Sequence, residues 1–360
     1  MEPADLIALS AAPGTPLKRQ QAASASANLD NRLETALELL APGEPAAALA
    51  ARLRQQAAAL LRQARRFGID VVPRGDPRYP PLLAVVPDAP LVLWVAGNPD
   101  VLTGPAVAIV GSRSASHASL EVAARIARDL APHVVVVSGL ARGCDAAAHV
   151  GALDGGGVTV GVLGTGPDMT YPAEHRQLAC EVRASGALVS ELSPGTPPLP
   201  HHFPLRNRII SGLSAGVLVI EAGERSGSLI TASCALEQGR AVMAVPGTVL
   251  GGRNRGSHAL LRDGARLVET ADDVLEEIFG VGTVPPAAPG ARSAASVAGG
   301  DDPVLAQLEE GDGLGLDELA ARTGLAPGAL LARLGRLEMT GAARRLAGGR
   351  FVRLKGKVIT

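Results

Sequence analysis

The stretch VLVIEAGERSGSLITA, residues 217–232, runs from an apolar segment into a small polar turn and then into a helical pattern. A short apolar run that is bounded by a glycine-containing turn is typical of a buried strand. We therefore expect a strand over residues 217–221 and a helix that begins near Leu229. A strand that passes through a turn directly into a helix is one half of a βαβ unit.

The same order of strand, turn and helix recurs along residues 106–280. Because such alternation brings parallel strands side by side with helices on both faces, it predicts an α/β fold with a doubly wound parallel sheet. The strands that we expect in this region are 107–110, 134–137, 159–163, 187–191, 217–221 and 241–246.

Changes in composition divide the chain into four regions. Residues 1–66 carry leucine at three- and four-residue intervals, which predicts a domain of amphipathic helices. Residues 67–280 form the core, whose first part is punctuated by proline and has short β-type runs. Residues 281–300 are a linker rich in Pro, Ala, Gly and Ser. Residues 301–360 show the order helix, helix, turn, helix and hairpin, which predicts a winged helix.

Composition limits the classes of function. The formal net charge is -1 at pH 7, so no overall positive field indicates nucleic acid or membrane, and an anion site must be built locally. The cysteines Cys144, Cys180 and Cys234 lack metal-ligand spacing, which indicates reduced thiols. No signal-peptide pattern is visible at the N-terminus, and no apolar run approaches the roughly 20 residues that span a bilayer. We expect a soluble cytoplasmic protein.

Four of the expected strands run into small polar turns that contain glycine. In a doubly wound sheet the carboxyl ends of the strands border one crevice, and the unpaired backbone N–H groups there favour anions. Arg206, Asn207 and Arg208 precede the strand at 217–221, and arginine binds phosphate bidentately. We therefore predict that these arginines and turns bind phosphate groups. The turn residues are Gly111, Ser112, Arg113, Gly139, Arg142, Gly143, Gly164, Gly166, Ser226, Gly227 and Ser228.

Other interpretations of these residues stay open. Each turn taken singly fits ordinary glycine turn geometry, and Arg142 is spaced to form a local ion pair with Asp145. No turn has the spacing GxGxxG or GxxxxGK[ST], so a dinucleotide or Walker-type site is not supported. Glu191 and Glu221 end two strands and are conceivable catalytic carboxylates, although we expect them to hold arginines or cap turns.

A metal site, a cofactor and covalent catalysis are not expected. His201 and His202 are adjacent, and adjacent side chains on an extended segment point in opposite directions. Ser138 and Ser228 lack a histidine and an acid that would form a recognisable triad. Aromatic residues are few, and Phe203 beside the arginines is the best placed of them to stack on a base.

Several blocks over residues 70–280 resemble the DprA (Smf) family of DNA processing proteins. These are VAIVGSRSAS, VVVVSGLARGCDAAAH, GTGPDMTYP, HFPLRNRIISGLSAGVLVIEAGERSGSLITASCALEQGRAVMAVPG and GGRNRGSHALLRDGA. The resemblance implies an extended Rossmann-like core without known enzymatic turnover, preceded by a helical SAM-like domain and followed by a winged helix. It also implies a homodimer that binds single-stranded DNA (ssDNA), protects it during natural transformation and loads RecA onto DNA coated by single-stranded DNA-binding protein.

The resemblance also implies which residues bind DNA, and it shows departures from the family pattern. After Tyr171 and Pro172 the family often has a lysine that contacts DNA, and here Ala173 follows, so Arg176 is our expected replacement. Cys144 stands where the family usually has an aliphatic residue. The positions that match the family's DNA-binding pocket are Gly111, Ser112, Arg113, Gly139, Gly143, Gly164, Gly166, Phe203, Arg206, Asn207 and Arg208.

These patterns are compatible with three functions. The leading one is a non-catalytic ssDNA-binding recombination mediator. The alternatives are a nucleotide-processing enzyme of the phosphoribohydrolase type and a small-nucleotide sensor. Phosphoribohydrolases usually show a PGGxGTxxE block with a catalytic glutamate, whereas this chain reads ERSGSLITA in that region. Whether the winged helix contacts duplex DNA, a second strand or a protein partner is left open.

Overall fold

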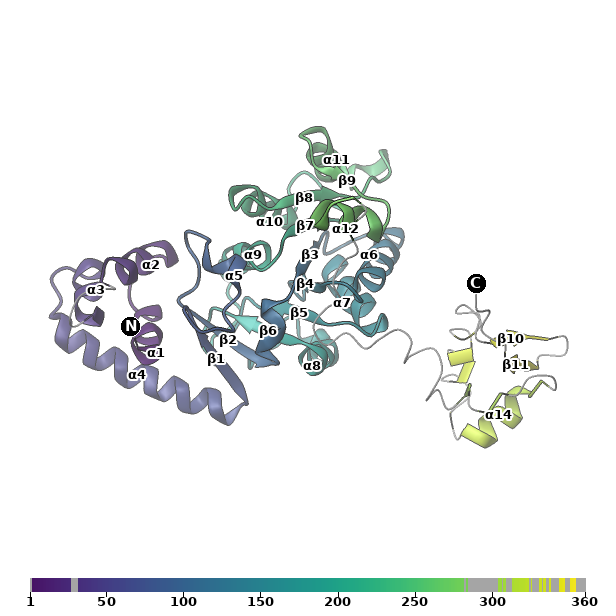
Figure 1. Cartoon of the computed structure of the whole chain (residues 1–360), viewed down its shortest axis with the longest axis horizontal. Coiled ribbons are helices and arrows are strands. Elements are labelled where there is room, and N and C mark those ends of the chain that lie inside the picture. The colour runs from purple at the N-terminus through teal and green to yellow at the C-terminus, as the bar shows by residue number, and fades with distance from the viewer. Residues whose placement is uncertain are drawn as a thin grey trace. The chain divides into compact units, whose positions relative to one another are not determined.

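The computed structural model describes residues 2–26, 32–281, 283, 304–305, 307–308, 313–323, 325, 330–331, 333–334, 337, 343–346 and 350–353. The chain forms two compact units, Met1–Ala291 and Arg292–Thr360. Figure 1 shows the N-terminal helices in purple and the sheet in blue to green. None of the helices in the described ranges has both the length and the apolarity to cross a membrane.

Four helices form the N-terminal region, in agreement with the leucine spacing: α1 (Pro3–Ser10), α2 (Pro16–Ala25), α3 (Arg32–Leu40) and α4 (Ala46–Arg66). Thr15 caps α2, because its side chain accepts a hydrogen bond from the Lys18 N–H. The buried leucines of these helices share one hydrophobic cluster with Ile69 and Trp94 of the sheet. The helical region is therefore packed onto the core within the first unit.

A nine-stranded sheet in the order β1-β2-β6-β5-β4-β3-β7-β8-β9 forms the centre of this unit. It is parallel from β6 to β9, whereas β2 is antiparallel to both of its neighbours. All six strands expected over residues 106–280 are present, and the short β9 was not expected. The strands are β1 (Ile69–Pro73), β2 (Val92–Gly97), β3 (Ala106–Val110), β4 (Val135–Ser138), β5 (Thr159–Val162), β6 (Ala187–Ser190), β7 (Gly216–Val219), β8 (Ala241–Ala244) and β9 (Arg266–Leu267).

Helices cover both faces of the sheet, because alternate residues along a strand point to opposite sides. In β3, Ala108 and Val110 face one hydrophobic cluster, and Val107 and Ile109 face the other. The first cluster includes α5 (Pro81–Ala84), α9 (His202–Gly212) and α10 (Gly227–Glu237). The second includes α6 (His117–Leu130), α7 (Cys144–Asp154) and α12 (Ala271–Phe279). Helix α8 (Arg176–Ser185) packs against β5 and β6, and helix α11 (Arg255–Arg262) packs against β8.

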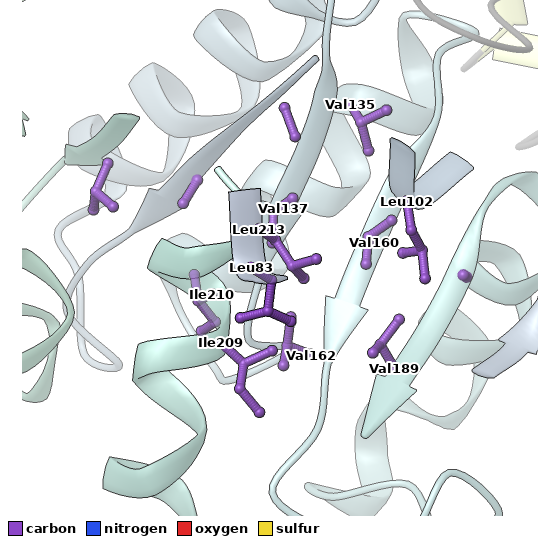
Figure 2. Packing of buried hydrophobic residues seen from close by; sticks show 14 of the residues in the cluster. Leu83, Leu102, Val135, Val137, Val160, Val162, Val189, Ile209, Ile210 and Leu213 are labelled. Carbon is purple, nitrogen blue, oxygen red and sulfur yellow. The ribbon is translucent and has the colours of Figure 1, made fainter. Parts of the chain in front are cut away.

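The first cluster fixes α9 on the sheet. Figure 2 shows Ile209 and Ile210 of α9, and Leu213 directly after it, close to Val137 of β4 and Val162 of β5. All five side chains are buried. Burial of a valine, leucine or isoleucine side chain contributes about 1.5–3 kcal/mol, so this contact holds α9 firmly and sets the position of the polar residues that the helix carries.

The direction of winding reverses at β3. From β3 the chain passes outward through β4, β5 and β6, and β7 then pairs with the other edge of β3. A crevice forms beyond the carboxyl ends of two such strands, because their connecting loops diverge to opposite faces. The turns after β3 and β7 therefore border the ligand site that this topology favours.

The second unit contains α14 (Leu316–Thr323) and a hairpin of β10 (Ala343–Arg345) and β11 (Phe351–Arg353), which pair antiparallel. The second expected helix and the hairpin are confirmed. Leu319, Leu330, Leu334 and Phe351 belong to a hydrophobic cluster of its own. The helices expected at 302–310 and 326–341 lie largely outside the described residues.

Candidate functional site

An open cleft of about 540 Å³ lies beyond the ends of β3 and β7, at the point where the winding reverses. It combines the turn after β3, the first half of α9 and the turn that leads into α10. The expected residues that line it are Gly111, Ser112, Arg113, Phe203, Arg206, Asn207, Ser226, Gly227 and Ser228. Those that do not line it are Gly139, Arg142, Gly143, Gly164, Gly166, Arg176 and Arg208.

The turn after β3 is fixed to β7 and presents Arg113. The Ser112 N–H donates to the Glu221 carbonyl oxygen at 2.8 Å, and Arg253 donates to the Ser114 carbonyl oxygen at 2.7 Å. The Arg113 side chain is exposed, and its guanidinium carbon lies 5.8 Å from the centre of the Phe203 ring. No hydrogen bond or ion pair with another described residue engages that guanidinium. Arg113 is thus held in place but available to an anion.

Glu221 is a supporting residue of this turn. Its carboxylate accepts hydrogen bonds from the Ser116 N–H at 3.1 Å and the Ser119 hydroxyl at 2.8 Å, at the start of α6. Burial alone would raise the pKa of Glu221, but the hydrogen bonds from these serines outweigh it and lower the pKa. Our expectation that Glu221 caps a turn is confirmed, since its side chain is 1% exposed and fully engaged.

Arg206 lines the cleft but is turned inward. Its guanidinium donates to the carbonyl oxygens of Gly139, at 2.6 Å, and of Val162, so it holds the ends of β4 and β5. A side chain on Gly139 would collide with this guanidinium, because a Cβ there would lie 2.3 Å from Nη1. Burial lowers the pKa of Arg206 to about 10, against the raising effect of Asp145, so the group stays charged at neutral pH. The expected phosphate-binding role is therefore indirect for Arg206 and Gly139.

Arg208, which we expected to bind phosphate, does not line the cleft. Its side chain is buried and forms ion pairs with Glu191 at 2.6 Å and Asp88 at 3.2 Å. The expectation that Glu191 holds an arginine is confirmed. A phosphate could pair with Arg208 only by displacing the carboxylates of Glu191 and Asp88, whose side chains are 19% and 34% exposed.

Asn207 and the serine turn form the opposite wall. The Asn207 amide donates to the Gly227 carbonyl oxygen at 3.3 Å and so joins α9 to the start of α10. Ser226 caps α10, accepting from the Ser228 N–H at 3.4 Å. The helix begins at Gly227, two residues before the expected Leu229. Its first backbone N–H groups lie at the cleft, where they favour an anion.

An aromatic pair lies at the edge of the cleft. The rings of Phe203 and Tyr171 are 5.2 Å apart between centroids and inclined at 43°. Gly164 makes room for Phe203, because a Cβ at residue 164 would lie 2.9 Å from the ring. The expected residue Gly164 therefore supports the site from outside the cleft.

The remaining expected residues are placed as follows. Arg142 is exposed and pairs with Glu174, so the alternative of an Arg142–Asp145 ion pair is wrong. Gly143 precedes α7, where it packs against the Ser112 carbonyl oxygen. Arg176 is the first residue of α8 and is exposed. The Gly166 N–H donates a hydrogen bond to the Thr196 carbonyl oxygen.

Features of a catalytic or metal centre are not assembled in the part of the chain that the structure describes. No group of three or more His, Cys, Asp or Glu residues there could hold a metal ion. His202 begins α9, and its ring lies 4.4 Å from that of His201, so this segment is not extended as we had expected. The Ser138 hydroxyl is buried and donates to the Ile109 carbonyl oxygen at 2.6 Å. It is therefore not placed to act as a nucleophile.

Two charged residues at the cleft were missed in the sequence. Arg225 lines the cleft, is exposed and has no hydrogen bond or ion pair with any described residue. It stands one residue before the serine turn in ERSGS, so the strand-end argument would have included it. Asp145 also lines the cleft, and its carboxylate accepts from the Gly139 and Ala141 N–H groups. Burial raises the pKa of Asp145, while Arg206 acts to lower it.

Family models match both the core and the C-terminal region of the chain. The model of the family described as DNA recombination-mediator protein A matches residues 70–279, and the DprA winged helix domain model matches residues 285–349. The DNA processing protein DprA of Streptococcus pneumoniae is 46% identical over 202 residues, which cover 56% of this chain and 72% of that protein. The protein Smf of Escherichia coli is 42% identical over 254 residues, which cover 65% of this chain and 68% of that protein.

Two solved structures extend the comparison to the fold. The X-ray structure of DprA from Streptococcus pneumoniae aligns with a TM-score of 0.70 and 37% identity, over 77% of this chain and 98% of that one. A structure of DNA processing protein A from Helicobacter pylori, described for its single-stranded DNA binding mode, aligns with a TM-score of 0.53 and 26% identity, over 58% and 95% of the two chains. With its core and its C-terminal region both matched, the chain belongs to the DprA (Smf) family of DNA recombination mediators.

Proposed function

We propose that the cleft binds single-stranded DNA and that the protein acts without catalytic turnover. In this proposal it protects incoming ssDNA during natural transformation and loads RecA onto it. The observation that carries the proposal is Arg113, which is exposed, positioned by two hydrogen-bonded turns and unpaired among the described residues. Arg225 and the N–H groups at the start of α10 add donors on the opposite wall.

The chemistry of the cleft favours phosphate over base edges. Backbone N–H groups, serine hydroxyls and arginines all donate hydrogen bonds, and a phosphate accepts them whatever the base sequence. Phe203 is the aromatic side chain that lines the cleft, and a base of any type can stack on it. We therefore expect binding that is nearly independent of sequence and weaker for duplex, whose bases are already stacked.

The enzymatic alternative has little support from the carboxylates near the cleft. Glu221 is occupied by hydrogen bonds at the start of α6, and Asp145 by the N–H groups of Gly139 and Ala141. A phosphoribohydrolase would release a free base from a nucleoside monophosphate, and we expect no release. A small-nucleotide sensor would bind a mononucleotide as tightly as an oligonucleotide, which the open shape of the cleft does not favour.

The substitution Arg113→Ala tests the site. Loss of one charge-assisted hydrogen bond should cost about 1.5–3 kcal/mol of binding free energy, which is about 10- to 150-fold in affinity. The slope of log affinity against log salt should also fall by about 0.7 in magnitude, as expected for one phosphate contact on a single strand. Arg128→Ala, at an exposed position in the last turn of α6, is the matched control. Wild-type ssDNA affinity in Arg113→Ala would refute the proposed cleft.

The partners beyond DNA follow from the family and are also proposals. We infer a cytoplasmic homodimer that contacts RecA and single-stranded DNA-binding protein, with the winged helix available to duplex DNA or to a protein. Every residue that lines the cleft precedes residue 281. Truncation within 281–300 should therefore leave ssDNA affinity and its salt slope unchanged, and a slope reduced by two or more units would place part of the ssDNA site in the second unit.

A further inference from the structure

An aromatic surface continues from the cleft past the residues that line it. Phe203 lines the cleft, and Tyr171 packs against Phe203 with 5.2 Å between ring centroids. Tyr171 does not line the cleft and is 46% exposed. A ligand that leaves the cleft along Phe203 would therefore meet the ring of Tyr171 next.

The exposure of Tyr171 is not explained by the packing of the protein. Tyr79, by contrast, is 5% exposed, and its hydroxyl donates to the Pro90 carbonyl oxygen at 2.6 Å. The Tyr171 hydroxyl has no hydrogen bond with a described residue. The next residue, Pro172, is buried, so the backbone that carries the ring is anchored. An anchored, half-exposed ring beside a ligand cleft is suited to stacking.

A cation lies on the same side of the cleft. Arg142 is exposed and pairs at 2.5 Å with Glu174, which lies three residues after Tyr171. The Arg142–Glu174 pair is exposed on both sides, and exposed ion pairs contribute little net free energy. A phosphate can therefore take the place of the Glu174 carboxylate at small cost.

We propose that Tyr171 and Arg142 form a second nucleotide subsite of the ssDNA site, in which Tyr171 stacks on the base that follows the one on Phe203. Arg142 then contacts a phosphate of that nucleotide. This inference rests on the proposed function and adds to it a direction in which the strand leaves the cleft. It also accounts for Gly164 and Arg142, which the sequence places at the site and the cleft itself does not include.

Titration of the full-length protein with oligo-dT tests the subsite. Tyr171→Ala should weaken binding by about 5- to 150-fold, the range for loss of one base stacked on an aromatic ring. The salt slope should stay unchanged, because no phosphate contact is lost, and Tyr171→Phe should bind like the wild type. Phe67→Ala is the matched control, since Phe67 is 45% exposed and lies outside the cleft. Wild-type affinity in Tyr171→Ala would overturn the inference.

An oligonucleotide of abasic sites separates stacking from a general disturbance of the site. It should bind the wild type and Tyr171→Ala equally, because the base that the ring contacts is absent. An undiminished difference between the two on the abasic strand would refute stacking. Failure of the proposed function is distinguishable: it would appear as wild-type protein that binds no ssDNA, or as Arg113→Ala with full affinity. Loss in Arg113→Ala with no loss in Tyr171→Ala would reject the subsite alone.

Discussion

Replacement of Arg208 by alanine should destabilise the fold and leave ssDNA binding by the folded protein largely intact. The Arg208 side chain is 7% exposed and forms ion pairs with Glu191 at 2.6 Å and with Asp88 at 3.2 Å. Its truncation would leave both carboxylates without their cation and a gap on the buried side of α9. Arg208 does not line the cleft, so no ligand contact is lost directly.

The size of the effect follows from how buried the partners are. Breaking a fully buried ion pair costs about 3–5 kcal/mol. The side chains of Glu191 and Asp88 are 19% and 34% exposed, so water partly solvates their carboxylates once Arg208 is removed. The expected loss of unfolding free energy is therefore about 2–3 kcal/mol. For a domain of this size about 1 kcal/mol shifts the melting temperature by about 2–4 °C, which gives a decrease of about 4–12 °C.

Thermal melting and ssDNA titration on the same samples provide the assay. Arg113→Ala should show the reverse behaviour, with a melting temperature within about 2 °C of the wild type, because an exposed unpaired side chain contributes little to stability. Titration is carried out well below the melting temperature of Arg208→Ala. An Arg208→Ala protein that melts like the wild type but has lost its ssDNA affinity would refute this reasoning and make Arg208 a ligand contact.

Three further outcomes are expected. Gly164→Ala should push the Phe203 ring from its place and weaken ssDNA binding with little effect on the melting temperature, whereas unchanged affinity would show that the ring position is unimportant. Burial lowers the pKa of His149 to about 3, so between about pH 3 and pH 6.5 only the unfolded chain takes up this proton. Stability should therefore fall by about 1.4 kcal/mol per pH unit, and His149→Gln should remove that slope in urea titrations. Glu221→Gln should cost about 1.5–3 kcal/mol of stability by weakening the bond to Ser116, and an unchanged urea midpoint would contradict the capping role.

The strands and the position of the cleft could be predicted from the sequence, because both depend on local patterns. Apolar runs that end in glycine turns predicted the strands β3 and β7. Because parallel strands end at the same edge of a sheet, the two runs also predicted the edge at which the cleft lies. Arg113 lies in the turn that begins at Gly111, directly after such a run, so its place at the cleft was predictable. The switch between β3 and β7 itself required the strand order, which no local pattern contains.

The roles of Arg206, Asn207 and Arg208 could not be predicted, because the segment before β7 was not recognised as a helix. On α9 (His202–Gly212) successive side chains point about 100° apart, so three neighbours cannot face one ligand. Arg206 points to the strand ends, Asn207 to α10, and Arg208 to Glu191 and Asp88. The three polar residues in a row therefore connect the helix to three different parts of the core.

The charges inside and at the rim of the cleft have different consequences for ssDNA binding. Arg206 is buried, and its guanidinium donates to the carbonyl oxygens of Gly139 and Val162. The attraction for phosphate then comes from the backbone N–H groups and from Arg113 and Arg225. Contacts from these two arginines alone predict a salt slope of about -1.4 on a single strand, and the proposed contact from Arg142 brings it to about -2.1. A measured slope of only about -1.4 would mean that Arg142, whose ion pair among the described residues is with Glu174, makes no phosphate contact.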